Sequence, residues 1–180
     1  MTTIERAVPV TPAAPSRVSR VLLAALRIGV ALMWIQGASW KTPPAFGQGD
    51  KPSGLFKFTS FAVEHEVFAP WAWVVENLVL PNFTVFGWTT LLVEASLGAF
   101  LLVGLATRLW ALVGIGQSMA ILLSVANAPH EWVWAYVLMV LAHLAIFATA
   151  AGRYYGLDGV LRERWGHTDG RLARLLRRAS

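Results

Sequence analysis

The stretch VLLAALRIGVALMWIQGASWK, residues 21–41, has the length and hydropathy of a membrane-spanning helix, but Arg27 lies a third of the way along it. An isolated charge at such a depth costs about 2.5 to 3.5 kcal/mol by insertion scales. Charged side chains within a bilayer therefore face the interior of a helix bundle, where they have polar partners. The stretch predicts that the chain folds as several packed membrane helices that supply such partners for Arg27.

The composition of the whole chain is that of a membrane protein. Of its 180 residues, 56% are hydrophobic and 14% are charged, and the mean hydropathy is +0.55. Cysteine is absent from the sequence, which excludes disulfides, Cys-ligated zinc, iron–sulfur clusters and covalently attached haem. The net charge of +5 comes from arginines that flank apolar stretches, so we expect no nucleic-acid partner.

Hydropathy predicts an all-α membrane protein, a four-transmembrane-helix bundle with an extra outer interfacial helical segment. The aromatic outer loop, about 42–82, is too long to be only a connector. We expect a flexible cytoplasmic N-terminus over 1–20, a transmembrane domain over 21–151 and a basic cytoplasmic tail over 152–180. The four predicted spans are about 21–40, 83–104, 109–128 and 132–151.

Charge asymmetry predicts the orientation. Arginines precede the first span, follow the second and crowd the segment after the fourth, whereas the opposite side carries a mixture of lysines and acidic residues. The positive-inside rule then places both termini in the cytoplasm, with the protein a multi-pass component of the inner (plasma) membrane. We expect no cleaved signal peptide, because Arg27 interrupts the apolar region that such a peptide needs.

Each predicted span contributes one polar side chain to a common layer. Measured from the cytoplasmic end at 1.5 Å per residue, Arg27 lies roughly 10 Å deep, Glu94 and Gln117 roughly 15 Å, and His143 roughly 12 Å. Trp34 shares the helical stripe of Arg27. We therefore predict that Arg27 pairs with Glu94 in the bundle interior and that Gln117 and His143 complete the layer.

Two interpretations of this layer remain open. The ion pair and its hydrogen bonds can serve only to specify helix assembly. Alternatively, the layer lines a quinone site in which Arg27 and His143 donate to a quinone carbonyl, Glu94 relays protons, and Tyr136, on the stripe of His143, adds a contact. His143 is the sole histidine within a predicted span, so a bis-His haem is not expected, and we expect no metal.

Lys41, at the outer end of the first span, is a separate candidate. One cation beside Trp40 can hold a small anion. The alternative is that Lys41 is an anchor at the membrane interface, with its charged end in water.

Three motifs together resemble the DoxX/DoxD family of small four-helix membrane proteins. They are RIGVALMWIQGASWK in the first span, EASLGAFLLVGLATR from the second span into its loop, and AGRYYGLD after the fourth. The WIQGASWK form and the long outer loop are closer to the DoxD branch, known as a subunit of thiosulfate:quinone oxidoreductase. The positions that match the family motifs are Arg27, Trp34, Gly37, Lys41, Glu94, Gly98, Gly104, Arg108, Gly152, Arg153 and Asp158.

The resemblance implies an integral membrane component of a quinone-linked oxidoreductase, with thiosulfate:quinone electron transfer as the activity. Its implied cofactor is a quinone, and its expected partners are the lipid bilayer, a soluble or membrane companion subunit, and a second copy of the chain. The catalytic candidates are Arg27, Glu94 and His143, and the substrate or quinone contacts are Trp34, Lys41, Gln117 and Tyr136. The alternative function is a non-catalytic membrane scaffold that anchors soluble redox or oxidative-stress enzymes through its basic tail. A small-solute carrier is less favoured, because the sequence has no evident inverted repeat.

Overall fold

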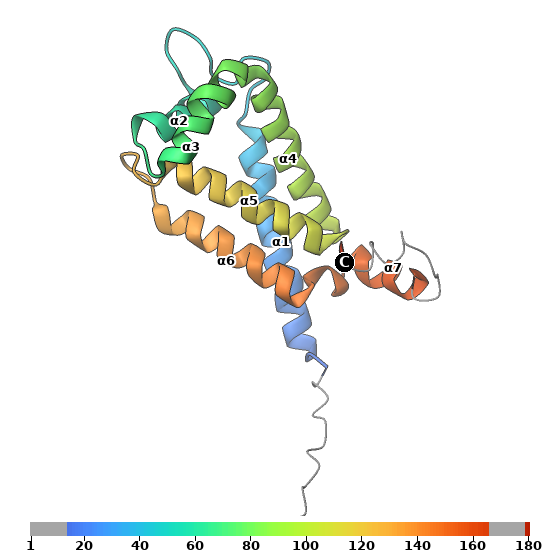
Figure 1. Ribbon diagram of the computed structural model, residues 1–180. Coiled ribbons are helices and arrows are strands. Elements are labelled where there is room, and N and C mark those ends of the chain that lie inside the picture. The colour runs from blue at the N-terminus through green and yellow to red at the C-terminus, as the bar shows by residue number, and fades with distance from the viewer. Residues whose placement is uncertain (1–13, 166–178) are drawn as a thin grey trace, which may run out of the picture.

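The structure is a computed structural model that describes residues 14–165 and 179–180. All regular structure in these residues is helical, as predicted. The long helices are α1, α4, α5 and α6, and Figure 1 shows the short helices α2 and α3 at one end of them and α7 at the other. We call these the α2–α3 end and the α7 end. The helices are α1 (Arg17–Ser39), α2 (Gly54–Glu64), α3 (Ala69–Val74), α4 (Phe83–Val103), α5 (Thr107–Val125), α6 (Val133–Thr149) and α7 (Leu157–Trp165).

Among the described residues, three helical stretches are long and apolar enough to cross a membrane. They are Arg17–Ser39, Ala69–Val103 and Thr107–Val125, and in each of them at most a third of the most apolar window is buried inside the protein. Large apolar side chains such as Leu22, Leu92 and Leu112 point outward instead, as expected of helices surrounded by lipid. The chain is an integral membrane protein. The apolar helix α6 has 17 residues and is shorter than these three.

The second span is not separated from the outer segment by a loop. Helix α3 continues through a π-helical turn, η1 (Val75–Val79), and a 3₁₀ turn, η2 (Leu80–Asn82), directly into α4. Pro81 lacks an N–H and its ring clashes with the preceding turn, which accounts for the irregular geometry where the helix bends. Pro70 lies in the first turn of α3, where a proline is tolerated, so it starts this helix and does not interrupt one.

The predicted ends of the chain are only partly described. Helix α1 starts at Arg17, with Ser16 accepting a hydrogen bond from the Ser19 N–H as its N-cap. Four residues of the segment predicted to be flexible, 17–20, are therefore helical. Within the predicted tail, 152–180, the structure has α7. Most of the arginine-rich stretch 170–180 lies outside the described residues.

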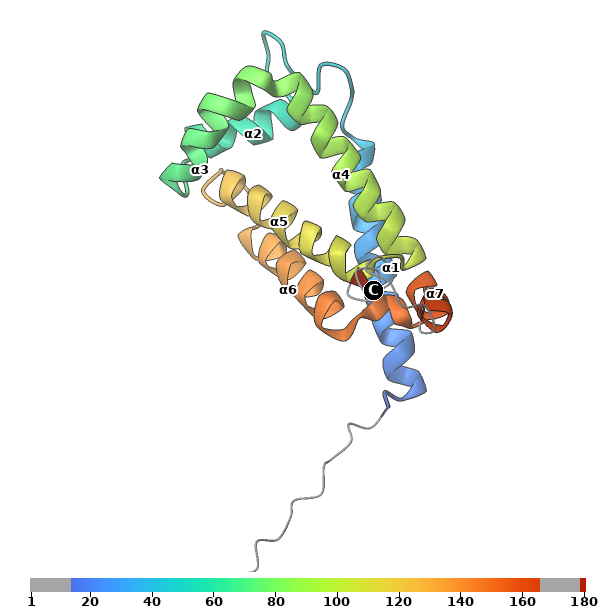
Figure 2. The ribbon, with the colours of Figure 1, turned by 45° about the vertical axis from the view of Figure 1, so that its right-hand side comes forward.

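The long helices form two closely packed pairs. Helix α1 packs along α4, where a Cβ on Gly98 would lie 2.6 Å from Ile35, and α5 packs along α6. Such close approach of backbones is typical of membrane helices, because small residues allow it. A core that includes Trp34, Leu97 and Ile146 joins the pairs. Figure 2 shows that the pairs diverge toward α2 and α3, which lie across the wide end.

Candidate functional site

Arg27 is fully buried near the α7 end, and backbone carbonyls surround its guanidinium. It donates hydrogen bonds to the carbonyl oxygens of Leu101, Leu102 (2.8 Å) and Tyr155 (3.3 Å). The first two belong to the last turn of α4, whose carbonyls have no partners within the helix and carry partial negative charge. The end of a helix therefore compensates the charge of Arg27.

The predicted ion pair between Arg27 and Glu94 is wrong. Glu94 lies seven residues before Leu101 on α4, roughly 10 Å further toward the α2–α3 end at the rise of an α-helix. Its salt bridge is with Lys41. The common polar layer thus separates into two levels, one at Arg27 and one at Glu94.

Asp158 completes the level of Arg27. Its carboxylate accepts hydrogen bonds from the backbone N–H groups of Ala106 (2.7 Å) and Thr107 (2.9 Å), where α5 begins. Its own N–H donates to the carbonyl oxygen of Gly104 at 2.8 Å. A carboxylate at a helix N-terminus and a cation at a helix C-terminus both complement the helix dipoles. We call this group of contacts the Arg27–Asp158 clasp, since it ties α1, α4, α5 and the segment after α6 together.

Glu94 and Lys41 form an ion pair that is buried on both sides. The Gln117 amide donates to the second carboxylate oxygen of Glu94 at 3.3 Å. The Lys41 ammonium also donates to the Gly37 carbonyl oxygen at 2.7 Å and lies 4.3 Å from the centre of the Trp40 ring. Burial lowers the pKa of Lys41, and the attraction of Glu94 opposes that change. Because Glu94 compensates its charge, Lys41 is better explained as the ion-pair partner of Glu94 than as a contact for a free anion.

His143 is fully buried and both of its ring nitrogens have partners. Trp34 Nε1 donates to His143 Nε2 at 2.9 Å, and His143 Nδ1 lies 2.7 Å from the carbonyl oxygen of Met139. Nε2 accepts a bond and Nδ1 faces an acceptor, so the proton is on Nδ1 and the imidazole is neutral. This geometry does not support the predicted bond from His143 to a quinone carbonyl, since the side chain instead holds the Trp34 indole in place.

A cavity of about 530 Å³ lies between the diverging helix pairs. Its walls come from α1, α4, α5 and α6, and α2 and α3 cover it. Five of the seven predicted site residues line it, while Arg27 and His143 do not. The five are Trp34, Lys41, Glu94, Gln117 and Tyr136.

Sequence reasoning missed the part of the site that α2 and α3 contribute. Leu55, Phe58 and Thr59 of α2 line the cavity, as does Trp71 of α3. Trp71 Nε1 donates to Ser124 Oγ of α5 at 3.0 Å, and this bond attaches the cover to the bundle. An amphipathic pattern in a loop does not reveal which helices it lies against. The sequence offers one indication of this contact: Ser124 lies on the same helical stripe as Gln117, so a polar group faces the bundle interior near the end of the third predicted span.

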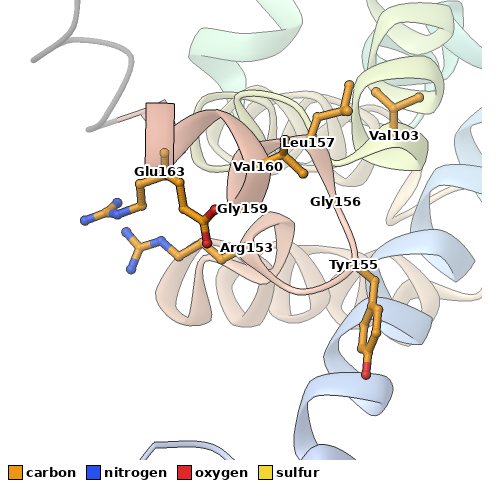
Figure 3. Close-up of a pocket in the computed structure, with 9 residues that line it drawn as sticks. Val103, Arg153, Tyr155, Gly156, Leu157, Gly159, Val160 and Glu163 are labelled. Atoms are coloured by element: carbon orange, nitrogen blue, oxygen red, sulfur yellow. The ribbon is translucent and has the colours of Figure 1, made fainter. Parts of the chain in front are cut away.

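A second cavity, of about 910 Å³, lies at the α7 end (Figure 3). Val103, Leu157 and Val160 line it together with Arg153 and Glu163, and Tyr155 points away from these side chains. None of the predicted site residues lines this cavity. We take the smaller cavity as the candidate site, because buried polar groups converge there on mostly apolar walls.

The fold and the site define an integral membrane protein, helical throughout the described residues, with a mostly apolar cavity in which a few buried polar groups converge. A family model described as "TQO small subunit DoxD" matches residues 22–177, most of the chain, where TQO denotes thiosulfate:quinone oxidoreductase. The chain belongs to the DoxD family, which confirms the resemblance seen in its motifs. Searches of curated proteins and of solved structures gave no match.

Proposed function

We propose that this chain is the membrane subunit of a thiosulfate:quinone oxidoreductase and that the cavity beside Glu94 binds the quinone ring. The observation that carries the proposal is the buried Lys41–Glu94 pair, with Gln117, in the wall of a cavity otherwise lined mainly by apolar and aromatic side chains. Family membership supports the same activity.

The cavity matches the chemistry of a quinone. A quinone ring is flat and apolar on its faces, and its two carbonyl oxygens accept hydrogen bonds. Trp34, Trp71 and Phe86 supply flat apolar walls, while Lys41 and Gln117 supply N–H donors. The volume of about 530 Å³ lies within the range of about 300 to 1,000 Å³ that is typical of sites for small organic ligands.

Glu94 is the proposed proton-handling group. Reduction of a quinone to a quinol takes up two electrons and two protons, and the oxygen atoms receive both protons. The Glu94 carboxylate bonds to Lys41 and Gln117, so a proton can pass between the ammonium, the carboxylate and a quinone oxygen within the cavity. This assignment keeps Glu94 as a relay, but it moves the donor role from Arg27 and His143 to Lys41 and Gln117.

The electrons come from thiosulfate through a companion subunit in this proposal. Lys41 was the expected anion contact, but its charge is already compensated by Glu94. A doubly charged anion therefore gains little from Lys41 and would lose its hydration on entering the cavity. Thiosulfate oxidation is accordingly assigned to the companion.

The proposed placement in the membrane uses four helices. Helix α6 and the 3₁₀ turn that follows it, η3 (Ala151–Arg153), together complete a fourth crossing of the inner membrane. Both termini are then cytoplasmic, and the α2–α3 end is the outer one. The arginines of η3 and α7 support this direction.

The test is thiosulfate-dependent reduction of a short-chain quinone by the purified protein together with its co-purifying partners. Glu94→Gln should lower turnover at least about a hundredfold, because the amide cannot relay a proton. Glu66→Gln makes the same change at an exposed carboxylate outside the cavity and should leave turnover unchanged. Equal turnover in wild type and Glu94→Gln would contradict the proposal.

The same preparation separates the enzyme from the scaffold alternative. A scaffold would retain its soluble partners but show no quinone reduction in the wild type. Its proposed docking segment is the basic tail, of which the part 166–178 lies outside the described residues. Truncation after Trp165 that releases the partners would favour the scaffold.

A further inference from the structure

The candidate cavity is not sealed, and its exposed rim is confined to one side. The lining residues with exposed side chains are Met33 (51% exposed) and Gln36 of α1, Trp40 (45%) directly after α1, and Phe58 (39%) of α2. The residues that line it from α4, α5 and α6 are buried or half-buried. The opening therefore lies along α1, beneath α2.

One stripe of α1 indicates which neighbour borders the opening. Leu26, Met33 and Trp40 are seven residues apart and so lie on the same face of the helix. Leu26 is partly buried against the core shared by both helix pairs, and α6 is the helix of the second pair that packs on α1, whereas Met33 and Trp40 are exposed. Burial of this stripe is lost toward the α2–α3 end, where the α5–α6 pair diverges from α1. The opening is thus a gap between α1 and α6.

The depth of the opening decides what it faces. Met33 lies six residues before the last residue of α1, Ser39, so it is roughly 9 Å inside the end of a spanning helix. Side chains around it on the outer surface, such as Leu32 and Ile35, are apolar and exposed. A gap at this depth opens onto lipid chains and not onto water.

We propose that a quinone with a long isoprenoid tail enters the cavity sideways from the bilayer, through a mouth between α1 and α6 whose rim is Met33, Gln36, Trp40 and Phe58. The inference rests on the function proposed above and specifies its substrate class. The polar end of the cavity, at Lys41 and Glu94, fits the ring. A long tail exceeds the cavity of about 530 Å³, so it passes through the mainly apolar mouth into the lipid, where its apolar surface stays out of water.

The test compares two probes, a benzoquinone without a tail and the same ring with a decyl tail, by titration calorimetry of the purified protein. Met33→Trp narrows the mouth, and Leu32→Trp places the same side chain at an exposed neighbour that does not line the cavity. In Met33→Trp the ratio of the Kd for the tailed probe to the Kd for the tail-less probe should rise at least about tenfold over wild type. In Leu32→Trp this ratio should remain at the wild-type value.

The outcomes distinguish this inference from the function on which it rests. If the wild type binds neither probe, both the proposed quinone site and the proposed mouth are contradicted. If the wild type binds both probes and Met33→Trp leaves the ratio unchanged, the mouth is overturned while the quinone site stands.

A labelling experiment makes the test independent of whether Met33→Trp folds. A decyl quinone with a diazirine at the middle of the tail, activated by light on wild-type protein, should label Met33, Gln36 or Phe58. Labelling confined to Trp71 and Ser124, which line the cavity from α3 and α5 and are not part of the rim, would overturn the mouth.

Discussion

Lys41 and Glu94 form a buried ion pair across 53 residues of sequence, joining the end of α1 to the middle of α4. Neither side chain has room to reach bulk water, since each exposes only a few per cent of its surface. Removal of one partner leaves an uncompensated charge in a water-poor interior, which is costly, whereas removal of both charges is not. This asymmetry gives the first prediction.

Lys41→Met and Glu94→Gln should each lower the free energy of unfolding by about 3 to 5 kcal/mol, because each leaves its partner unpaired. The double variant should lose less than either single variant. Thermal or denaturant unfolding in detergent micelles measures all three. Losses that simply add in the double variant would contradict a direct interaction between the two side chains.

Arg27 should be required for assembly and not for the chemistry. Arg27→Lys keeps the charge but replaces the planar fork with a single ammonium, so it cannot reach all the carbonyls of Leu101, Leu102 and Tyr155. We expect a markedly lower melting temperature in detergent. The fraction of Arg27→Lys that is folded should bind the tail-less quinone with wild-type affinity. A loss of affinity without a loss of stability would return Arg27 to the ligand site.

Asp158→Ala should destabilise the α7 end of the bundle. It removes the acceptor for the N–H groups of Ala106 and Thr107, and each buried donor left without a partner costs about 1 to 3 kcal/mol. Asp158→Asn retains one carboxamide oxygen and should lose less. Hydrogen exchange at the start of α5 measures the effect directly, and unchanged protection of Thr107 in Asp158→Ala would be inconsistent with the clasp.

Gly114→Ala should displace His143, since a Cβ at this position would lie 2.2 Å from two atoms of the imidazole ring. We expect a loss of stability of about 1 to 3 kcal/mol from overpacking. We also expect a change in tryptophan fluorescence, because Trp34 loses its hydrogen-bond partner. Gly116→Ala is the matched control on the same helix, where a Cβ would meet nothing within 4 Å. Equal effects of the two substitutions on stability and fluorescence would show that neither depends on the close contact between Gly114 and His143.

Sequence reasoning could predict the class of the protein and five of the residues in the cavity wall. Hydropathy over a span of about 20 residues reports directly on lipid, because every buried backbone group must then be bonded within a helix. Helical phase put Trp34, Gln117 and Tyr136 on inward faces, and the structure has all three in the cavity wall. The motifs around Arg27, Glu94 and Arg153 identified the family, which the family comparison confirms.

The partner of Arg27 could not be predicted in the same way. The predicted depths are measured from the cytoplasmic end of each span. They therefore assume that the cytoplasmic ends of all four helices lie at the same depth in the membrane. Arg27 lies ten residues after the start of α1 at Arg17, yet its partners Leu101 and Leu102 lie in the last turn of α4. The helices are staggered by roughly 10 to 15 Å. Charge pairing rules also give no weight to carbonyl groups at a helix end, although these are the acceptors that hold Arg27.

The Arg27–Asp158 clasp has a mechanical consequence for the cavity. It joins the two helix pairs at their narrow end, whereas the hydrogen bonds described between the cover and the end of α5 are neutral ones, from Trp71 to Ser124 and from Asn127 to the Glu66 carbonyl oxygen. A lever pivoted at one end moves most at the other, so any tilt of α5 and α6 against α1 and α4 changes the width beneath α2 and α3 far more than the spacing around Arg27. The spacing of the two helix pairs is therefore fixed most firmly around Arg27, and the width of the space beside Glu94 is the dimension that a tilt of the pairs changes most.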